Sequence, residues 1–170
     1  MKPSDQAWEE SYPIYKKLIN HPYNQEMMQG TLSIDTYAFY MEQDGYYLPK
    51  YAKCDAIIAN EIKLKDKGYF WQSLKGTFQE EQNVVDFFAN NLNVAKTNII
   101  SPAALGYSSY ILSICASEPV ELAVAAILPC LWLYREVGIY KYNHSVPNNT
   151  YSNEMDYYMD PSFYASVTQA

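Results

Sequence analysis

The feature that most constrains this fold is a helical spacing of apolar residues that is interrupted repeatedly by helix start and stop signals. Apolar side chains recur at helical intervals, and no segment alternates apolar with polar residues or contains an Asn-Gly hairpin turn. Serine and proline mark several starts, as at Ser33, Ser101-Pro102 and Ser117-Glu118-Pro119. The chain is therefore predicted to be all-α.

The same signals predict where each helix lies. The residue before a proline avoids helical angles, so His21-Pro22 ends the first helix, and Gly30 ends the second. Pro49 is expected to bend the third helix. The expected segments are Ser4 to about His21, a shorter helix up to Gly30, Ser33 to about Lys63, about Asp66 to Asn91, Ser101 to about Ala116, Ser117 to about Asn143, and a final segment from near Thr150.

Length, charge and cysteine content narrow the class of protein. At 170 residues, 49% of them apolar, residues 1–170 are expected to form a single helical domain. The 12 basic and 19 acidic residues give a net charge of −7, which argues against nucleic acid or an anionic membrane as partner. The cysteines show no CxxC or zinc-type pairing, and the N-terminus lacks the layout of a signal peptide. A reduced, cytoplasmic protein is predicted.

The longest apolar run, Leu122 to Leu133, contains a candidate reactive thiol. It is about a dozen residues long, whereas a membrane span needs about 20, so we expect a central core helix. Cys130 follows Pro129, and a proline inside a helix removes a backbone donor and exposes neighbouring groups. Tyr134 lies one turn further on but supplies no positive charge that would activate the thiol. The alternative is that Cys130 is a small buried core residue.

A stripe of phenols around one carboxylate is the second candidate site. Its members are spaced at one or two turns of a single helix and therefore share one face: Tyr40, Asp44, Tyr47 and Tyr51. Such a face would suit the wall of a pocket for a flat polar ring, because aromatic faces stack and hydroxyl groups orient the ligand. The alternative is a partly exposed surface stripe.

Two other kinds of chemistry are disfavoured. His21 and His144 fall at predicted helix ends, where a histidine is usually a cap or loop residue, so a Cys-His protease pair is not expected. A di-iron site would need Glu-x-x-His spacing, which is absent, so we predict no metal. Glu80-Glu81 is a further carboxylate pair, although most such pairs on helices are solvated.

Several segments together resemble the TenA family, the thiaminase II or aminopyrimidine aminohydrolases. The order and spacing of these segments match along the whole chain: Trp8, His21-Pro22-Tyr23, Gly30-Thr31-Leu32, Tyr40, Gln43-Asp44-Gly45-Tyr46-Tyr47-Leu48, Ser101-Pro102-Ala103-Ala104, Tyr107 and Leu128 through Gly138. The resemblance implies a haem-oxygenase-like helical bundle that binds no haem or other cofactor, assembled as a homotetramer or dimer. It also implies hydrolysis of the substituent on the pyrimidine methylene of thiamine or its breakdown products, which gives hydroxymethylpyrimidine for thiamine salvage.

The resemblance also assigns roles to residues. Cys130 matches the cysteine that adds to the pyrimidine ring, and Asp44 should hydrogen-bond the aminopyrimidine. A carboxylate there can hold a proton that compensates charge developing as the thiolate adds. Residues expected to contact the substrate are Tyr40, Tyr47, Tyr107, Tyr134 and, by a looser match, Tyr158; Glu81 is expected in a supporting role.

One departure concerns the C-terminus. Members of the family usually continue for one or two more helices that carry a glutamate acting as general acid and base, and no residue before Ala170 matches it. Loss of those helices would leave apolar surface uncovered. Three explanations stay open: a fragment, a partner chain that completes the bundle, or a shortened relative that binds pyrimidines without turnover.

Overall fold

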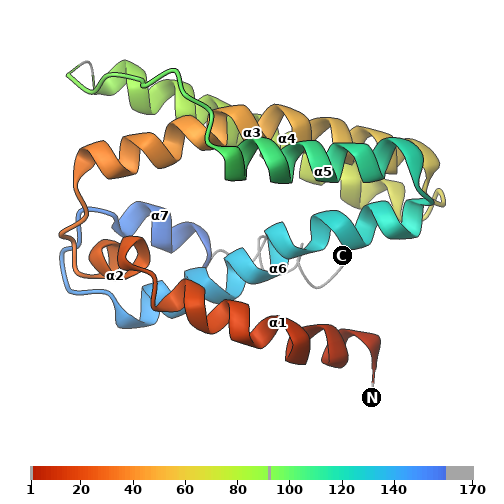
Figure 1. Cartoon of the computed structure of the whole chain (residues 1–170), viewed down its shortest axis with the longest axis horizontal. Coiled ribbons are helices and arrows are strands. Elements are labelled where there is room, and N and C mark those ends of the chain that lie inside the picture. The colour runs from red at the N-terminus through yellow and green to blue at the C-terminus, as the bar shows by residue number, and fades with distance from the viewer. Residues whose placement is uncertain (1, 92, 160–170) are drawn as a thin grey trace. The chain divides into compact units, whose positions relative to one another are not determined.

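A computed structural model of the chain describes residues 2–91 and 93–159, and these residues form seven α-helices (Figure 1). The predicted all-α class is confirmed, and the predicted boundaries agree with the structure to within a few residues. The helices are α1 (Pro3–Ile19), α2 (Pro22–Met28), α3 (Ile34–Glu61), α4 (Lys67–Asn90), α5 (Pro102–Ser117), α6 (Val120–His144) and α7 (Ser152–Tyr157).

The start signals at Ser33 and Ser101 act as the sequence predicts, whereas Ser117 is the last residue of α5 and α6 begins at Val120. Ser33 Oγ accepts a hydrogen bond from Thr36 N at 3.1 Å and begins α3, and Ser101 begins α5 in the same way. The side-chain oxygen satisfies a backbone donor that has no partner within the helix. Gly30 follows the end of α2 with a φ of +67°, a conformation that glycine adopts without steric cost.

By their contacts the residues group into two compact units. Of the described residues, the terminal unit comprises 2–32 and 130–159, and the central unit comprises 33–91 and 93–129. α6 begins in the central unit and ends in the terminal unit, with the division between Pro129 and Cys130.

In the central unit, α3 packs against α4 and α5. α3 and α4 are antiparallel, because Gly45 lies near Val84 while Asp55 lies near Ser73. A Cβ at Gly45 would stand 3.3 Å from Val84 Cγ1, so glycine permits this close approach. The buried core side chains of these helices include Ala52, Cys54, Ile58, Ala59, Phe70, Val84, Ile111 and Cys115.

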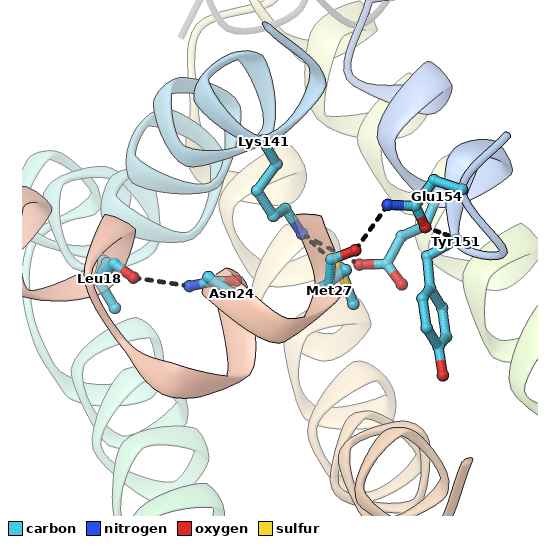
Figure 2. Close-up of polar contacts among 7 residues, drawn as sticks. Leu18, Asn24, Met27, Lys141, Tyr151 and Glu154 are labelled. Carbon is cyan, nitrogen blue, oxygen red and sulfur yellow. Dashed lines mark hydrogen bonds and ion pairs between the residues drawn. The ribbon is translucent and has the colours of Figure 1, made fainter. Parts of the chain in front are cut away.

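The terminal unit has a core of its own, built from Met27, Met28, Leu32, Val137, Tyr151 and Met155. Asn149 attaches the loop after α6 to the end of α2. Its Nδ2 donates to the carbonyl oxygens of Met27 and Met28 at 2.8 and 2.9 Å. Tyr151 Oη donates to the carbonyl of Leu32 at 2.8 Å. Asn24 Nδ2 donates to the carbonyl of Leu18, which joins α2 to α1 (Figure 2).

α6 differs from the central core helix that the sequence predicts. It is 25 residues long. Within the described part of the chain, it is the one helix that is both long enough and apolar enough to cross a membrane, judged by length and composition alone. The continuous apolar run, Leu122 to Leu133, covers about half of this helix. Only 22% of its most apolar stretch is buried. One such helix is weak evidence for a membrane span, because the core helix of a soluble protein passes the same test.

Candidate functional site

Two of the predicted substrate-contacting residues lie against each other in the central unit. Tyr47 of α3 and Tyr107 of α5 have ring centroids 5.8 Å apart and ring planes only 10° from parallel. Stacked phenol rings present a flat aromatic surface with hydroxyl groups at its edge. Tyr107 is 38% exposed, so part of this pair faces solvent.

Asp44 lies on the same helix, three residues before Tyr47 and therefore on the same side of α3. Its side chain is partly buried. Tyr51, one turn after Tyr47, is buried and tilts against the Tyr47 ring at 5.6 Å. Tyr40 stacks on Tyr37 at 6.5 Å. The predicted stripe thus continues along α3 as a row of aromatic rings with one carboxylate in the middle.

Glu81 lies on α4, three residues before the Val84 that meets Gly45. Its carboxylate has one buried oxygen, Oε1, which has no hydrogen-bond partner among the described residues. A buried oxygen with unused acceptor capacity is suited to accept a hydrogen bond from a ligand. This observation is compatible with the supporting role predicted for Glu81.

The loop between α4 and α5 is attached to α3 immediately before Asp44, through Glu42, which sequence reasoning missed. Glu42 is 4% exposed, and its Oε2 accepts hydrogen bonds from Thr97 N at 2.9 Å and Thr97 Oγ1 at 2.7 Å. Its Oε1 accepts from Asn98 N at 2.6 Å and from Tyr46 Oη at 3.5 Å. Burial raises the pKa of Glu42, but these hydrogen bonds outweigh it, so the pKa is lowered overall and the group is a carboxylate.

Two more contacts join α3 to the start of α5. Gln43 Nε2 donates to the carbonyl of Ile99 at 2.9 Å, and Gln43 Oε1 accepts from Ser101 N at 2.7 Å. Further along, Lys50 Nζ donates to the hydroxyl of buried Ser108 at 3.0 Å and to that of Ser109 at 3.3 Å. The Tyr47 and Tyr107 rings therefore lie between two polar contacts of the same pair of helices.

The remaining predicted site residues lie in the terminal unit. Cys130 is partly exposed, whereas Cys54 and Cys115 are buried. Burial raises the pKa of both buried thiols, which keeps them protonated and unreactive. Tyr134, one turn after Cys130, is 44% exposed. Among the three thiols, Cys130 is the one that a substrate could reach most readily.

Tyr158 packs against α6 at Gly138, two turns after Cys130 and on the same face. A Cβ at Gly138 would clash with the Tyr158 ring, so only glycine allows the ring this position. The Lys141 ammonium lies 5.5 Å from the centre of the Tyr158 ring. Lys141 is itself buried, and its Nζ lies 3.2 Å from Glu154 Oε1 and 3.3 Å from Met27 Sδ (Figure 2).

The predicted site residues thus form two groups, one in each unit. Asp44 and its neighbours belong to the central unit; Cys130, Tyr134 and Tyr158 belong to the terminal unit. The structure brings Tyr47 and Tyr107 together, and it places Tyr158 on the Cys130 face of α6. The pairing of Cys130 with Asp44 stays a prediction.

The histidines take the structural roles that the sequence suggested. His21 is the cap of α2, where its Nδ1 accepts from Tyr23 N at 3.2 Å. His144 is the last residue of α6 rather than a loop residue, and its ring stacks on Tyr140 at 3.9 Å. Within residues 2–91 and 93–159, no three His, Cys, Asp or Glu side chains lie close enough to hold a metal ion.

Comparison with solved structures identifies the fold. A TenA homologue from Pyrococcus furiosus superimposes with a TM-score of 0.89 at 16% sequence identity, covering 98% of this chain and 80% of that one. A TenA homologue from P. horikoshii gives a TM-score of 0.84 at 21% identity, covering 98% and 81%. The described helices therefore have the haem-oxygenase-like fold that the resemblance implied.

The family follows from the sequence match. Residues 8–170 match the TENA/THI-4/PQQC family, so the chain belongs to it. It is 36% identical over 123 residues to the aminopyrimidine aminohydrolase of Bacillus subtilis, covering 69% of this chain and 52% of the relative. It is 31% identical over 137 residues to that of Halalkalibacterium halodurans, covering 78% and 61%. The chain thus spans between about half and three fifths of these curated relatives.

Proposed function

We propose that this protein is an aminopyrimidine aminohydrolase of the thiaminase II type, acting in thiamine salvage. The observation that carries the proposal is the parallel Tyr47–Tyr107 pair with Asp44 on the adjoining turn of α3. Two flat rings next to a carboxylate suit an aminopyrimidine, which is flat and carries both an amino group and ring nitrogens. The names of the B. subtilis and H. halodurans relatives support the same substrate class.

In the proposed reaction, Asp44 binds the aminopyrimidine and orients the ring on Tyr47. The thiolate of Cys130 adds to a ring carbon, and the resulting electron pair expels the substituent from the exocyclic methylene, which leaves with a proton. Water then adds to that methylene, and cleavage of the C–S bond releases hydroxymethylpyrimidine. Asp44 compensates the charge that develops on the ring nitrogens during both steps.

The other residues assist binding. Tyr134 and Tyr158, on the Cys130 face of α6, would limit the volume around the thiol, and Tyr40 would extend the aromatic wall along α3. Glu81, with one buried oxygen that lacks a partner among the described residues, would accept a hydrogen bond from the substrate or from its water. The partial exposure of Cys130 supports its assignment as nucleophile.

The test is turnover of an aminomethylpyrimidine with and without the thiol. The protein should release ammonia and hydroxymethylpyrimidine, and Cys130→Ala should abolish both without loss of the helical circular dichroism. Cys115→Ala is the matched control, because it removes a buried thiol from a different helix and should retain turnover. Normal turnover by Cys130→Ala would contradict the proposed nucleophile.

A second candidate is a protein that binds pyrimidines without turnover. It is favoured by the location of Asp44, Tyr47 and Tyr107 within one unit, because that ring-binding surface does not depend on Cys130. This candidate predicts saturable binding of hydroxymethylpyrimidine without product formation. Detectable turnover by the 170-residue chain would exclude it.

We also propose that the protein is cytoplasmic and assembles as a homotetramer or dimer. α4 supports assembly, because it exposes three large apolar side chains at intervals of seven residues, which form one stripe: Trp71 (54% exposed), Phe78 (55%) and Val85 (56%). Sedimentation equilibrium would measure the assembly. A monomer at micromolar concentration would contradict this part of the proposal.

A further inference from the structure

Three contacts between α3 and α5 occur in the same order along both helices. Gln43 binds the backbone at Ser101, Tyr47 stacks on Tyr107, and Lys50 binds Ser108. The two helices are therefore parallel, and the position of Tyr107 depends on how far α5 is advanced along α3. A shift of α5 by one residue would move its side chains by about 1.5 Å along the helix and rotate them by about 100°.

A further contact precedes these three, between α3 and the loop that leads into α5. Thr97 and Asn98 together direct three donors at the Glu42 carboxylate, all at 2.9 Å or less. Asn98 has a φ of +56°, a left-handed conformation that costs asparagine less energy than most residues but more than glycine. The charged acceptor at Glu42 offsets that cost, because hydrogen bonds to a carboxylate are stronger than those to a neutral oxygen.

Gln43 extends these contacts from the loop to the start of α5. Its side-chain amide binds the carbonyl of Ile99 and the N–H of Ser101, and Ser101 is the residue that caps α5. The segment that leads into α5 is thereby held by two neighbouring α3 side chains, by Glu42 at Thr97 and Asn98 and by Gln43 at Ile99 and Ser101. Tyr107 follows six residues later on a helix that cannot slide while its first turn is held.

We propose that Glu42 and Gln43 are positioning residues that fix the register of α5 on α3 and so hold Tyr107 flat against Tyr47 to receive the substrate ring. The inference rests on the proposed function for the identity of the ligand. It assigns a role to two residues that touch neither the ring nor the reacting atoms. The stacked pair is thus assembled by contacts to the Thr97–Asn98 loop.

The first test measures the ring pair without any ligand. 3-Fluorotyrosine is placed at position 107, and the unstacked position of its fluorine resonance is defined by Tyr47→Leu. Glu42→Gln keeps the shape of the side chain but replaces one acceptor oxygen by an amino group that faces backbone donors. It should move the resonance toward the Tyr47→Leu position. A folded Glu42→Gln variant with the wild-type resonance would overturn the inference.

The second test separates binding from chemistry. Glu42→Gln should raise the KM for an aminomethylpyrimidine, and the Kd for hydroxymethylpyrimidine, by about tenfold, with kcat changed by less than about twofold. A loss confined to kcat, or an unchanged Kd, would overturn the inference. A wild-type protein that neither binds nor turns over pyrimidines would instead overturn the proposed function, while the fluorine measurement still decides the positioning role.

Matched variants control for general destabilisation. Glu61→Gln changes an exposed glutamate at the other end of α3 and should leave the resonance and the Kd unchanged. Thr97→Val removes one of the donors to Glu42 and should give the same changes in smaller size, which serves if Glu42→Gln does not fold. Thr97→Ser keeps the hydroxyl group and should restore the wild-type values.

Discussion

α3 carries two buried carboxyl groups that the protein treats in opposite ways. Glu42 and Asp55 are 4% and 0% exposed, and they lie thirteen residues apart on one helix. Glu42 accepts hydrogen bonds from two backbone N–H groups and two hydroxyl groups, and its pKa is lowered. Asp55 Oδ2 accepts from Ser73 Oγ at 2.8 Å, while its Oδ1 is buried without a partner among the described residues. Burial raises the pKa of Asp55 to about 7.

This difference indicates that the number of hydrogen-bond donors, rather than the degree of burial, decides whether a buried carboxyl group is ionised. Burial disfavours the ionised form at both positions, and only at Glu42 do enough donors converge to reverse the effect. The Glu42 end of α3 is therefore a charged attachment point beside the candidate site. At the other end of α3, Asp55 lies next to the buried Cys54, and its raised pKa favours a neutral carboxyl group.

The largest expected effect is the pH dependence that Asp55 imposes. Its pKa is raised from 3.8 to about 7 by burial, although the hydrogen bond from Ser73 and the influence of the Thr77 hydroxyl oppose the rise. The folded protein therefore holds the Asp55 proton more tightly than the unfolded chain, so the contribution of Asp55 to stability is largest below about pH 4 and is lost as the pH rises to about 7. The shift corresponds to a loss on the order of 4 kcal/mol.

Urea unfolding at pH 5 and pH 8 checks this prediction. The wild type should be less stable at pH 8 than at pH 5, and Asp55→Asn should remove most of the difference, because the amide cannot ionise. Equal pH dependence in both proteins would show that Asp55 is ionised in the fold, and the contrast with Glu42 would disappear.

Glu42→Gln should have the next largest effect, with the opposite pH dependence. We expect the free energy of unfolding to fall by about 2 kcal/mol at pH 7, because buried donors lose a charged acceptor. A lowered folded pKa means that this contribution is present above the unfolded pKa of about 4.3 and is lost as the pH falls through the folded pKa. The difference from wild type should therefore shrink in acid, and a difference that grows in acid would contradict the prediction.

Thr97→Val should cost less, about 1 kcal/mol, because it removes one of several donors and leaves the others in place. The same urea titration at pH 7 measures it. Combining it with Glu42→Gln should cost less than the sum of the two single changes, since both act on one contact. Strict additivity would indicate that Thr97 stabilises the loop independently of Glu42.

Ser73→Ala should have the smallest effect at pH 5, about 0.5 kcal/mol, because Asp55 is neutral there and loses only one hydrogen bond. At pH 8 the cost should be larger, because the lost hydrogen bond had stabilised the ionised form. Denaturant titrations at the two pH values test this. A cost that is the same at both would indicate that Ser73 does not favour ionised Asp55.

Local sequence signals predicted most of the secondary structure and part of the site. The helix limits follow from Ser33, Ser101 and the prolines, whose effects act within a few residues. The face shared by Asp44 and Tyr47 follows from helical spacing. The resemblance to a known family placed Tyr47 and Tyr107 among the substrate-contacting residues, but their stacking on each other came from the structure, because an entire helix and loop separate the pair.

The Glu42 contact could not be predicted, because it depends on where a loop far along the chain returns. Residues 91–101 are predicted only as an Asn-rich connector, and the left-handed conformation of Asn98 was seen only in the structure. The exposure of α6 was missed for a related reason. An apolar pattern reports what a helix can bury, whereas burial itself depends on the helices that come to cover it.

The parallel arrangement of α3 and α5 has a consequence for the order of folding. Contacts between α3 and α4, such as Ser73 with Asp55, join residues 18 positions apart, whereas Glu42 and Thr97 are 55 positions apart. Closing the longer loop costs more chain entropy, so we expect the α3–α4 hairpin to form first and α5 to dock later. The surface that would receive the pyrimidine therefore does not exist in the hairpin and is completed only when α5 docks.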